Sequence, residues 1–487
     1  MEVIYDNKTG TQVLQLEKDC FYHDIAKKMS EEEQNLNGRV TVSCDDGRVS
    51  YGIRERSGTQ CISQLSNSLP GDYMQADLPS KYLTCVKQEK NSYKFYRLDE
   101  CVNPDNGKLE FKASWGRMGT NKGELFGQRS CFFPLEMFWI KYFEKIGKGY
   151  VDQSDLYITA NDQKKEAETK KDIKDAKTAN RIVNKISAKL FGLLKQFSKH
   201  AVKKAQVRVP ITEPIIKRSE ELIKAMYTAK DVDEFNDLLT QNISILQRPV
   251  ATGNGRGVYN LMAKSPDEFK SIIERESDLL DAMKGVYYGD SYSTQTEEGS
   301  FDDYDIEVYE ATDKQKEDVL RHLSDQLKPK VANVYRVIPH KQQKAFNEYL
   351  KKNDIKAVKQ LWHGSRNENW MSIIINSLSL NPNAIITGKM FGNGIYFAPS
   401  SMKSWNYTSF RGTSWAKGSS DTAFMGLYAV AYGKPLDVEH HRYYTQAMLD
   451  KEGKNCVHAH KGAELLNDEI IFYSEKAMVL NYIVEFH

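Results

Sequence analysis

The chain reads Leu361-Trp362-His363-Gly364-Ser365-Arg366, then Met390-Phe391-Gly392-Asn393-Gly394-Ile395-Tyr396-Phe397-Ala398, then Lys403-Ser404-Trp405-Asn406-Tyr407. The glycine after His363 lets a ligand approach the backbone closely. The second piece is a glycine turn that leads into a short β-rich run. In the third, one helical turn would place the Ser404 hydroxyl and the Tyr407 ring on the same face. Backbone groups and a hydroxyl hold amides, and aromatic faces cover rings, so these pieces predict a site for a flat, amide-bearing ligand.

A fourth stretch follows, Leu466-Asn467-Asp468-Glu469-Ile470-Ile471-Phe472-Tyr473. In this order, the four pieces resemble the NAD-binding signature and the glutamate-bearing strand of the poly(ADP-ribose) polymerases. The resemblance implies a mixed α/β catalytic domain with antiparallel sheets over residues 305–487, with NAD+ as its substrate. Gly392-Asn393-Gly394 lacks the third glycine of a dinucleotide-binding loop and opens no helix, so we reject that alternative.

The resemblance also implies roles for single residues. ADP-ribosyl transfer passes through an oxocarbenium-like transition state, which needs a carboxylate to stabilise positive charge and activate an acceptor hydroxyl. Glu469 matches that carboxylate, and His363 and Tyr396 complete the catalytic set. The positions that match NAD contacts are His363 for a ribose hydroxyl, Gly364 and Ser404 for the carboxamide, Tyr396 and Tyr407 for the ring, Ser365 and Asn369 for the adenosine side, Phe397 and Ala398 within the signature, and Lys403 beside the acceptor.

Two features depart from the family pattern. Ser379 stands where many members carry an arginine, and Asn393 stands where they often carry a lysine. The segment between Val438 and Glu469, which resembles the acceptor-binding loop, is also short. The glutamate itself favours polymer formation, and transfer of a single ADP-ribose unit is the alternative.

Length and composition set the broad class. A chain of 487 residues suggests about three domains, and 40% apolar and 28% charged residues are ordinary for globular proteins. No run of 18 apolar residues occurs, so we expect no membrane span and no membrane partner. The N-terminus carries no signal-peptide pattern, and the cysteines are scattered singly without a Cys-x-x-Cys pair. We expect reduced thiols and, with the resemblance, a nuclear protein.

Residues 1–72 predict either a small β-rich module or an extension of the next domain. The alternation in Gln12–Leu16 and again in 39–43 is typical of strands, and Asp45-Asp46-Gly47 between alternating runs indicates a hairpin turn. Its function is not readable from the sequence.

Residues 73–160 predict two antiparallel strands followed by an amphipathic helix over 134–146. The second strand runs from Lys108 to Trp115 and ends in Gly116-Arg117-Met118-Gly119. Trp-Gly-Arg-x-Gly in this setting resembles the WGR domain of the same polymerases. The resemblance implies that Trp115 and Arg117 contact DNA, by stacking and by a phosphate contact. The alternative is a core tryptophan and a surface arginine.

Residues 161–180 predict a charged linker, and residues 181–286 an all-α block. Between Asp155 and Arg208, 14 basic and 6 acidic residues give a local charge of +8. This basic run is either a solvated helix face or a surface that faces nucleic acid. Ser265-Pro266 starts a helix that we expect to stop at Gly285. The block resembles the family's helical regulatory domain, and a linker over 287–304 follows it.

A metal site is one further possibility near the catalytic strand. Cys456, His458 and His460 alternate, so a strand would place all three on one face, as zinc ligands require. The family's equivalent stretch holds no metal, so we expect none.

Taken together, the sequence predicts a multidomain α+β protein: a small antiparallel WGR domain with a helix, an all-α regulatory bundle, and an antiparallel-sheet ADP-ribosyltransferase domain. It predicts an enzyme without N-terminal zinc fingers that responds to DNA ends or breaks and modifies acceptor proteins, itself included, as a monomer away from DNA. A non-catalytic DNA-end-binding scaffold and an NAD glycohydrolase are the alternatives.

Overall fold

The computed structural model describes fifteen parts of the chain, namely residues 2–7, 10–15, 35–44, 47–57, 78, 80–87, 91–118, 129–157, 184–207, 209–250, 257–291, 299–380, 390–413, 418–462 and 464–487. The chain divides into two compact units. The first comprises Met1–Lys164, Arg208–Pro210 and Ile243–Met262, and the second comprises Lys165–Val207, Ile211–Asn242 and Ala263–His487. Within these described parts, we find no helix with the length and apolarity that crossing a membrane requires.

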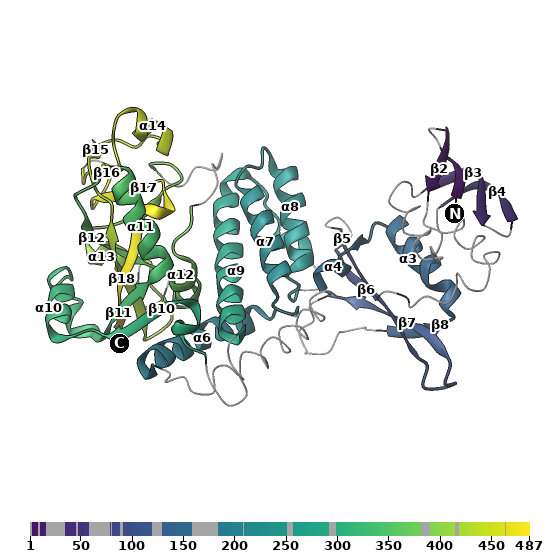
Figure 1. The fold of residues 1–487 in the computed structure, drawn as a ribbon, viewed down its shortest axis with the longest axis horizontal. Helices are drawn as coiled ribbons and strands as arrows, with labels where there is room; N and C mark the ends of the chain where they lie inside the picture. The colour runs from purple at the N-terminus through teal and green to yellow at the C-terminus, as the bar shows by residue number, and fades with distance from the viewer. Residues whose placement is uncertain are drawn as a thin grey trace. The chain divides into compact units, whose positions relative to one another are not determined.

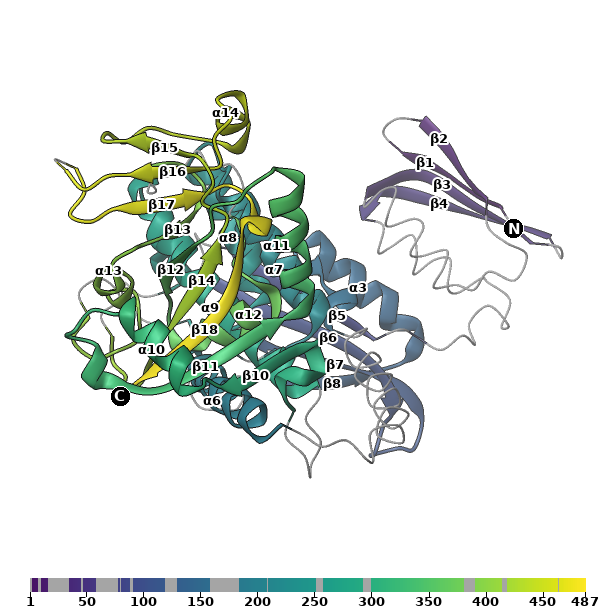
Figure 2. The same cartoon turned by 60° about the vertical axis from the view of Figure 1, so that its left-hand side comes forward.

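The first unit begins with a four-stranded antiparallel sheet (Figure 2). Its strands lie in the order β2-β1-β3-β4 and are β1 (Glu2–Asn7), β2 (Gly10–Gln15), β3 (Asn35–Cys44) and β4 (Gly47–Ser57). Cys44 pairs with Gly47, so β3 and β4 form the expected hairpin. The two turn residues 45–46 lie outside the described residues. The β-rich character predicted for this region is therefore confirmed.

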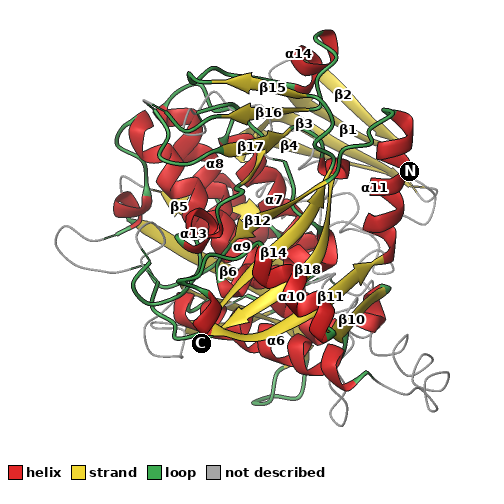
Figure 3. Ribbon diagram, turned by 90° about the vertical axis from the view of Figure 1, so that its left-hand side faces the viewer, coloured by secondary structure: helices red, strands yellow, loops and turns green. Residues whose placement is uncertain are grey.

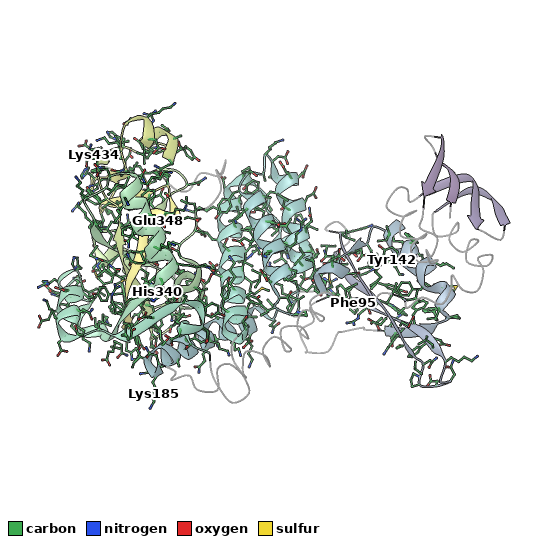
Figure 4. The ribbon with its side chains drawn as sticks, in the orientation of Figure 1. Phe95, Tyr142, Lys185, His340, Glu348 and Lys434 are labelled. Carbon is green, nitrogen blue, oxygen red and sulfur yellow. The ribbon has the colours of Figure 1, made fainter. Side chains whose placement is uncertain are left out.

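A second antiparallel sheet in this unit has the order β8-β7-β6-β5-β9. The strands are β5 (Lys81–Lys87), β6 (Ser92–Val102), β7 (Leu109–Arg117), β8 (Arg129–Phe133) and β9 (Val151–Asp152), and they are joined by η2 (Leu135–Met137), α3 (Phe138–Gly147) and α4 (Ser154–Tyr157). Leu98, Phe111 and Phe138 are fully buried where α3 packs on the sheet. Figure 4 labels Phe95 on β6 and Tyr142 on α3, whose hydroxyl donates to Asp152 Oδ2 at 2.8 Å. The predicted strands and helix are confirmed here.

The segment Ile243–Met262, which includes η3 (Val258–Leu261), belongs to the same unit as this sheet. Its backbone is held by one side chain of the sheet and one of α4. The Tyr93 hydroxyl donates to Ile243 O at 3.2 Å and accepts from Arg248 N at 3.1 Å. The Tyr157 hydroxyl donates to Ile245 O at 2.7 Å. A stretch that looks in sequence like an interhelical loop is therefore anchored through its buried backbone groups.

The helices of the second unit are α6 (Lys185–Ala205), α7 (Glu213–Met226), α8 (Val232–Ile245), whose last three residues fall in the first unit, and α9 (Phe269–Ser291), which follows η4 (Pro266–Glu268). Figure 1 shows α7, α8 and α9 running side by side. A buried polar chain crosses them: Ser219 Oγ donates to Asn242 Oδ1 at 2.7 Å, and Asn242 Nδ2 donates to Glu276 Oε2 at 3.0 Å. Glu276 is fully buried, so these bonds replace its lost hydration.

The predicted end of the last helix at Gly285 is wrong, because α9 continues to Ser291. Gly285 is buried, and a Cβ there would collide with the Ser198 side chain on α6. The glycine therefore serves the close approach of two helices rather than a helix end. Residues 287–291, which we expected in a linker, are the last residues of α9.

The remainder of the second unit is built on two sheets (Figure 3). The first has the order β10-β11-β18-β14-β12, all antiparallel, with β10 (Ile306–Glu310), β11 (Val331–Pro339), β18 (Met478–Phe486), β14 (Ala423–Val430) and β12 (Lys359–Gly364). The second has the order β13-β17-β16-β15, with β13 (Ile395–Phe397), β17 (Glu469–Phe472), β16 (Cys456–Ala459) and β15 (Pro435–Val438), the last pair parallel. The mixed, antiparallel-sheet class predicted from sequence is confirmed.

Short helices surround these sheets: η5 (Phe301–Tyr304), α10 (Asp313–Arg321), η6 (Lys328–Lys330), α11 (His340–Lys352), η7 (Asn367–Asn369), α12 (Trp370–Asn376), α13 (Ser401–Trp405), α14 (Gln446–Lys451) and η8 (Glu475–Ala477). Helix α6 shares their core, because Leu190, Phe191 and Leu194 are fully buried in one cluster with Trp370 and Phe424. Helix α6 and the sheets of this unit are therefore packed through one apolar cluster.

Candidate active site

The end of β12 is held against α13 by backbone and hydroxyl contacts. Trp362 exchanges two backbone hydrogen bonds with Ala398, at 3.0 and 3.1 Å, which joins β12 to the residue after β13. Ser404 Oγ donates to Trp362 O at 3.0 Å, and Ser404 is almost fully buried. A Cβ at position 364 would collide with the Ser404 backbone, so only glycine permits this approach. The predicted carboxamide pair, Gly364 and Ser404, is thus in contact.

Strand β13 brings Tyr396 to His363. His363 Nδ1 lies 3.2 Å from Tyr396 O, and its ring packs 5.7 Å from that of Phe397. The Tyr396 hydroxyl donates to Gly392 O at 2.9 Å and accepts from Phe391 N at 3.1 Å. Burial raises the pKa of Tyr396, so its hydroxyl stays neutral and keeps closing the glycine turn.

Glu469 is the first residue of β17, and its carboxylate forms an ion pair with Lys403 on α13. Both side chains are mostly buried, at 14% and 17% exposure. Strand β17 pairs with β13, with Phe397 opposite Ile470. This pairing places Glu469 on the strand next to the one that carries Tyr396. Residues 66 positions apart in sequence therefore meet next to Ser404.

The predicted adenosine-side residues lie on the turn that follows β12. Asn369 Nδ2 lies 3.2 Å from Ser365 Oγ and 3.3 Å from Asp278 Oδ1, a carboxylate on α9. Arg366 Nε lies 3.2 Å from the other oxygen of Asp278. The helical block therefore touches this turn directly. Sequence reasoning missed Asp278 and gave Arg366 no role, because an acid on a helix 88 residues away carries no local signal.

The other predicted NAD-contact residues differ in exposure. Tyr407 is 48% exposed, which suits a ring that covers a ligand. Phe397 and Ala398 are 2% and 3% exposed, so their side chains support the site from beneath. Ser379 is exposed in the segment after α12, and Asn393 Nδ2 donates to the Tyr443 hydroxyl at 3.4 Å.

The predicted DNA-contact residues lie together at the end of β7. Trp115 is partly buried, and its ring stacks on Tyr96 at 5.9 Å. Arg117 donates to Asn91 O at 2.8 Å and to Asn91 Oδ1 at 3.0 Å. Asn91 Oδ1 also accepts from Val258 N at 3.1 Å. Arg117 therefore ties the sheet to the segment Ile243–Met262, a role that the motif alone does not indicate.

Comparisons with known proteins agree with this geometry. Residues 309–481 match the family model described as the poly(ADP-ribose) polymerase catalytic domain. The chain is 24% identical over 404 residues to a poly [ADP-ribose] polymerase of Sarcophaga peregrina, a match that covers 76% of this chain and 39% of that protein. It is 27% identical over 175 residues to a putative poly [ADP-ribose] polymerase-like protein of Invertebrate iridescent virus 6, covering 34% of this chain and 92% of that protein. Human poly [ADP-ribose] polymerase 2 is 58% identical over 48 residues, which are 10% of this chain and 8% of that protein.

The sheets and the site residues of the second unit therefore lie in a region that is similar to the poly(ADP-ribose) polymerase catalytic domain. Residues 309–481 belong to the poly(ADP-ribose) polymerase catalytic domain family, and most of the chain is similar to polymerases of Sarcophaga peregrina and Drosophila melanogaster. It spans about two fifths of the length of the Sarcophaga relative.

Proposed function

We propose that this chain is a DNA-break-responsive enzyme that transfers ADP-ribose from NAD+ to proteins, itself included, and extends the product to poly(ADP-ribose). The observation that carries the proposal is the Glu469–Lys403 ion pair beside Ser404. The neighbouring strands β12 and β13 carry His363 and Tyr396, which contact each other. These groups come from four separate segments and converge only in the folded chain.

The contacts of Ser404 suit it to bind a carboxamide. Its hydroxyl hydrogen is directed to Trp362 O, so the oxygen lone pairs are left to accept a carboxamide N–H. The Gly364 backbone lies against Ser404 and can complete the pair of contacts. Tyr407 would cover the nicotinamide ring from the exposed side, and His363 would bind the adjoining ribose.

In the chemical step, the bond between nicotinamide and the ribose C1′ carbon breaks, and nicotinamide leaves with the bonding electrons. Positive charge spreads over the ribose ring, and the acceptor oxygen forms the new bond to C1′. Glu469 stabilises that charge and receives the proton of an acceptor hydroxyl. Lys403 positions the carboxylate through their ion pair.

Product length depends on how the acceptor binds. The carboxylate favours elongation, because a ribose hydroxyl of the growing chain needs the same activation as the first acceptor. Transfer of a single unit is the second candidate, supported by the short segment between Val438 and Glu469. This segment holds α14 and β16.

We further propose that the helical block restrains the site until DNA binds. The support is the contact of Asp278 on α9 with Arg366 and Asn369, and the hydrogen bond from Ser198 on α6 to Glu368 O at 3.1 Å. DNA at Trp115 and Arg117 would act on the segment Ile243–Met262, which continues α8 along the chain. Release requires that DNA favour the unrestrained state. We also propose that the protein is nuclear and that it is monomeric when it is not bound to DNA.

A gel with labelled NAD+, with and without DNA ends, tests the proposal. Label on the protein that increases with DNA and extends into a ladder is expected for the full chain. Label as a single band would support single-unit transfer. Free ADP-ribose without protein label would indicate a glycohydrolase, and no turnover with intact DNA-end binding would indicate a scaffold.

A further inference from the structure

Two histidines and two carboxylates gather at the edge of the catalytic sheet, apart from the residues assigned above. Asp437 on β15 lies opposite His458 on β16, and the backbone of His460 continues the pairing by donating to Val438 O at 2.9 Å. Because alternate residues of a strand share a face, His458 and His460 point to the same side. One ligand atom from each of Asp437, His458 and His460 lies within 4.8 Å of the others.

The two imidazole rings lie between the two carboxylates. They stack at 4.0 Å with an interplanar angle of 29°. Asp437 Oδ1 lies 2.7 Å from His460 Nε2 and 3.8 Å from His458 Nδ1. On the other side, Asp468 Oδ2 lies 3.1 Å from His458 Nε2 and 4.0 Å from His460 Nδ1. Each ring thus directs one nitrogen to Asp437 and the other to Asp468.

We propose that Asp437, His458 and His460 bind a divalent transition-metal ion, zinc in the first instance, with Asp468 as the carboxylate behind the histidines. Imidazole and carboxylate are both ligands of zinc. A histidine that binds a metal usually donates its other N–H to a carboxylate, which is the position of Asp468. The site would have three protein ligands and a solvent-filled fourth position.

An ion between Asp437 and the two rings would contact one carboxylate oxygen and one nitrogen of each histidine. The ion must displace the Tyr432 hydroxyl, which lies 2.8 Å from His458 Nδ1.

The structure also corrects the third ligand suggested by the spacing of the motif. Cys456 is fully buried, and its thiol donates to Tyr432 O at 3.3 Å. It therefore lies outside the cluster, and Asp437 takes its place.

The site adjoins the catalytic strand. Asp468 precedes Glu469, and Ala459, between the two histidines, pairs with Glu469 across β16 and β17. Asp468 also accepts from Lys461 N at 2.8 Å, which fixes the loop between these strands. A bound ion would therefore join β15, β16 and the entry to β17, and it should stabilise this edge against thermal unfolding.

Zinc binding by the full chain, first freed of metal with a chelator, tests the proposal by titration calorimetry. One zinc ion per chain is expected, with no heat from Mg²⁺ or Ca²⁺, which prefer oxygen ligands. His458→Gln, His460→Gln and Asp437→Asn should each abolish or strongly weaken binding. Asp468→Asn should weaken it by about 10–100-fold.

The matched control is the double variant His440→Gln with His441→Gln. These exposed histidines pair with Glu464 elsewhere on the same domain. Zinc affinity equal to that of the parent chain is expected for this control.

The absorption of bound Co²⁺ should lack a thiolate charge-transfer band. Circular dichroism of the metal-free variants must match that of the parent chain. Because Asp437 is exposed, Asp437→Asn still tests the site if a histidine variant does not fold.

Stoichiometric zinc that survives in the folded Asp437→Asn and histidine variants would overturn the proposal. So would the absence of zinc binding by the parent chain, since the cluster would then be only a set of ion pairs.

Discussion

Asp278→Ala gives the sharpest test of the proposed restraint. The carboxylate reaches from α9 to two residues of the turn after β12, Arg366 and Asn369. Removing it leaves the transferase sheets and the predicted catalytic groups untouched. If α9 holds this turn in a restrained state, the variant should be more active without DNA than the parent chain. With saturating DNA ends the two should be equal.

The structure sets the expected size of the effect. The Asp278–Arg366 pair is about 40% exposed on both sides, and such pairs contribute about 0.5–1 kcal/mol. The 3.3 Å hydrogen bond from Asn369 adds about 0.5–1 kcal/mol. Losing about 1–2 kcal/mol of the free energy that favours the restrained state raises the population of the released state by roughly 5–30-fold, as long as the released state is rare. The initial rate of label incorporation without DNA should rise by the same factor.

The pH dependence gives a second reading of the same contact. Burial raises the pKa of Asp278 from 3.8 to about 6, although Arg366 lowers it in part. The ion pair is therefore complete well above that value and is lost as the pH falls through it. The ratio of variant to parent activity without DNA should shrink toward one as the pH is lowered through about 6.

Asp290→Ala is the matched control, since it is on the same helix and its carboxylate pairs with Lys195 and Lys199 of α6 at 3.1 and 3.0 Å. It weakens charge pairing of α9 without touching the turn after β12. A small change in DNA-free activity is expected. An Asp278→Ala chain no more active than the parent, or an equal rise in the control, would refute a restraint that acts through this turn.

Three further predictions concern the rest of the chain. Glu469→Gln should reduce elongation by about 10²–10⁴-fold while calorimetry still detects NAD+ binding; long polymer from this variant would exclude the catalytic role. Trp115→Ala and Arg117→Ala should each weaken binding to DNA ends in a fluorescence anisotropy titration and leave DNA-free activity unchanged; parent-like binding would make these residues purely structural. The fragment Phe301–His487 should melt far below the full chain in calorimetry, because it loses three fully buried side chains of α6, each contributing about 1.5–3 kcal/mol; an equal melting temperature would show that α6 contributes little.

The sequence by itself determined the elements and the order of the chemical groups. Strand alternation in β6 and β7, the helical period of α6 and the glycine turn before Tyr396 are local properties, which neighbouring residues impose through backbone sterics and burial of one face. The His363, Tyr396 and Glu469 motifs identified the transferase domain for the same reason: each is a short pattern tied to one turn or strand.

Only the tertiary structure decided which groups meet. The Lys403–Glu469 pair depends on the pairing of β13 with β17, and the contact of Asp278 with Arg366 depends on how α9 packs. Gly285 is the clearest example: its sequence context predicts a helix end, but it lies inside α9, where the missing side chain leaves room for Ser198. Likewise, strand register places Asp437, rather than Cys456, beside the two histidines. Such contacts join distant segments through sheet register and helix packing, which depend on the whole core and leave no periodic trace in the local sequence.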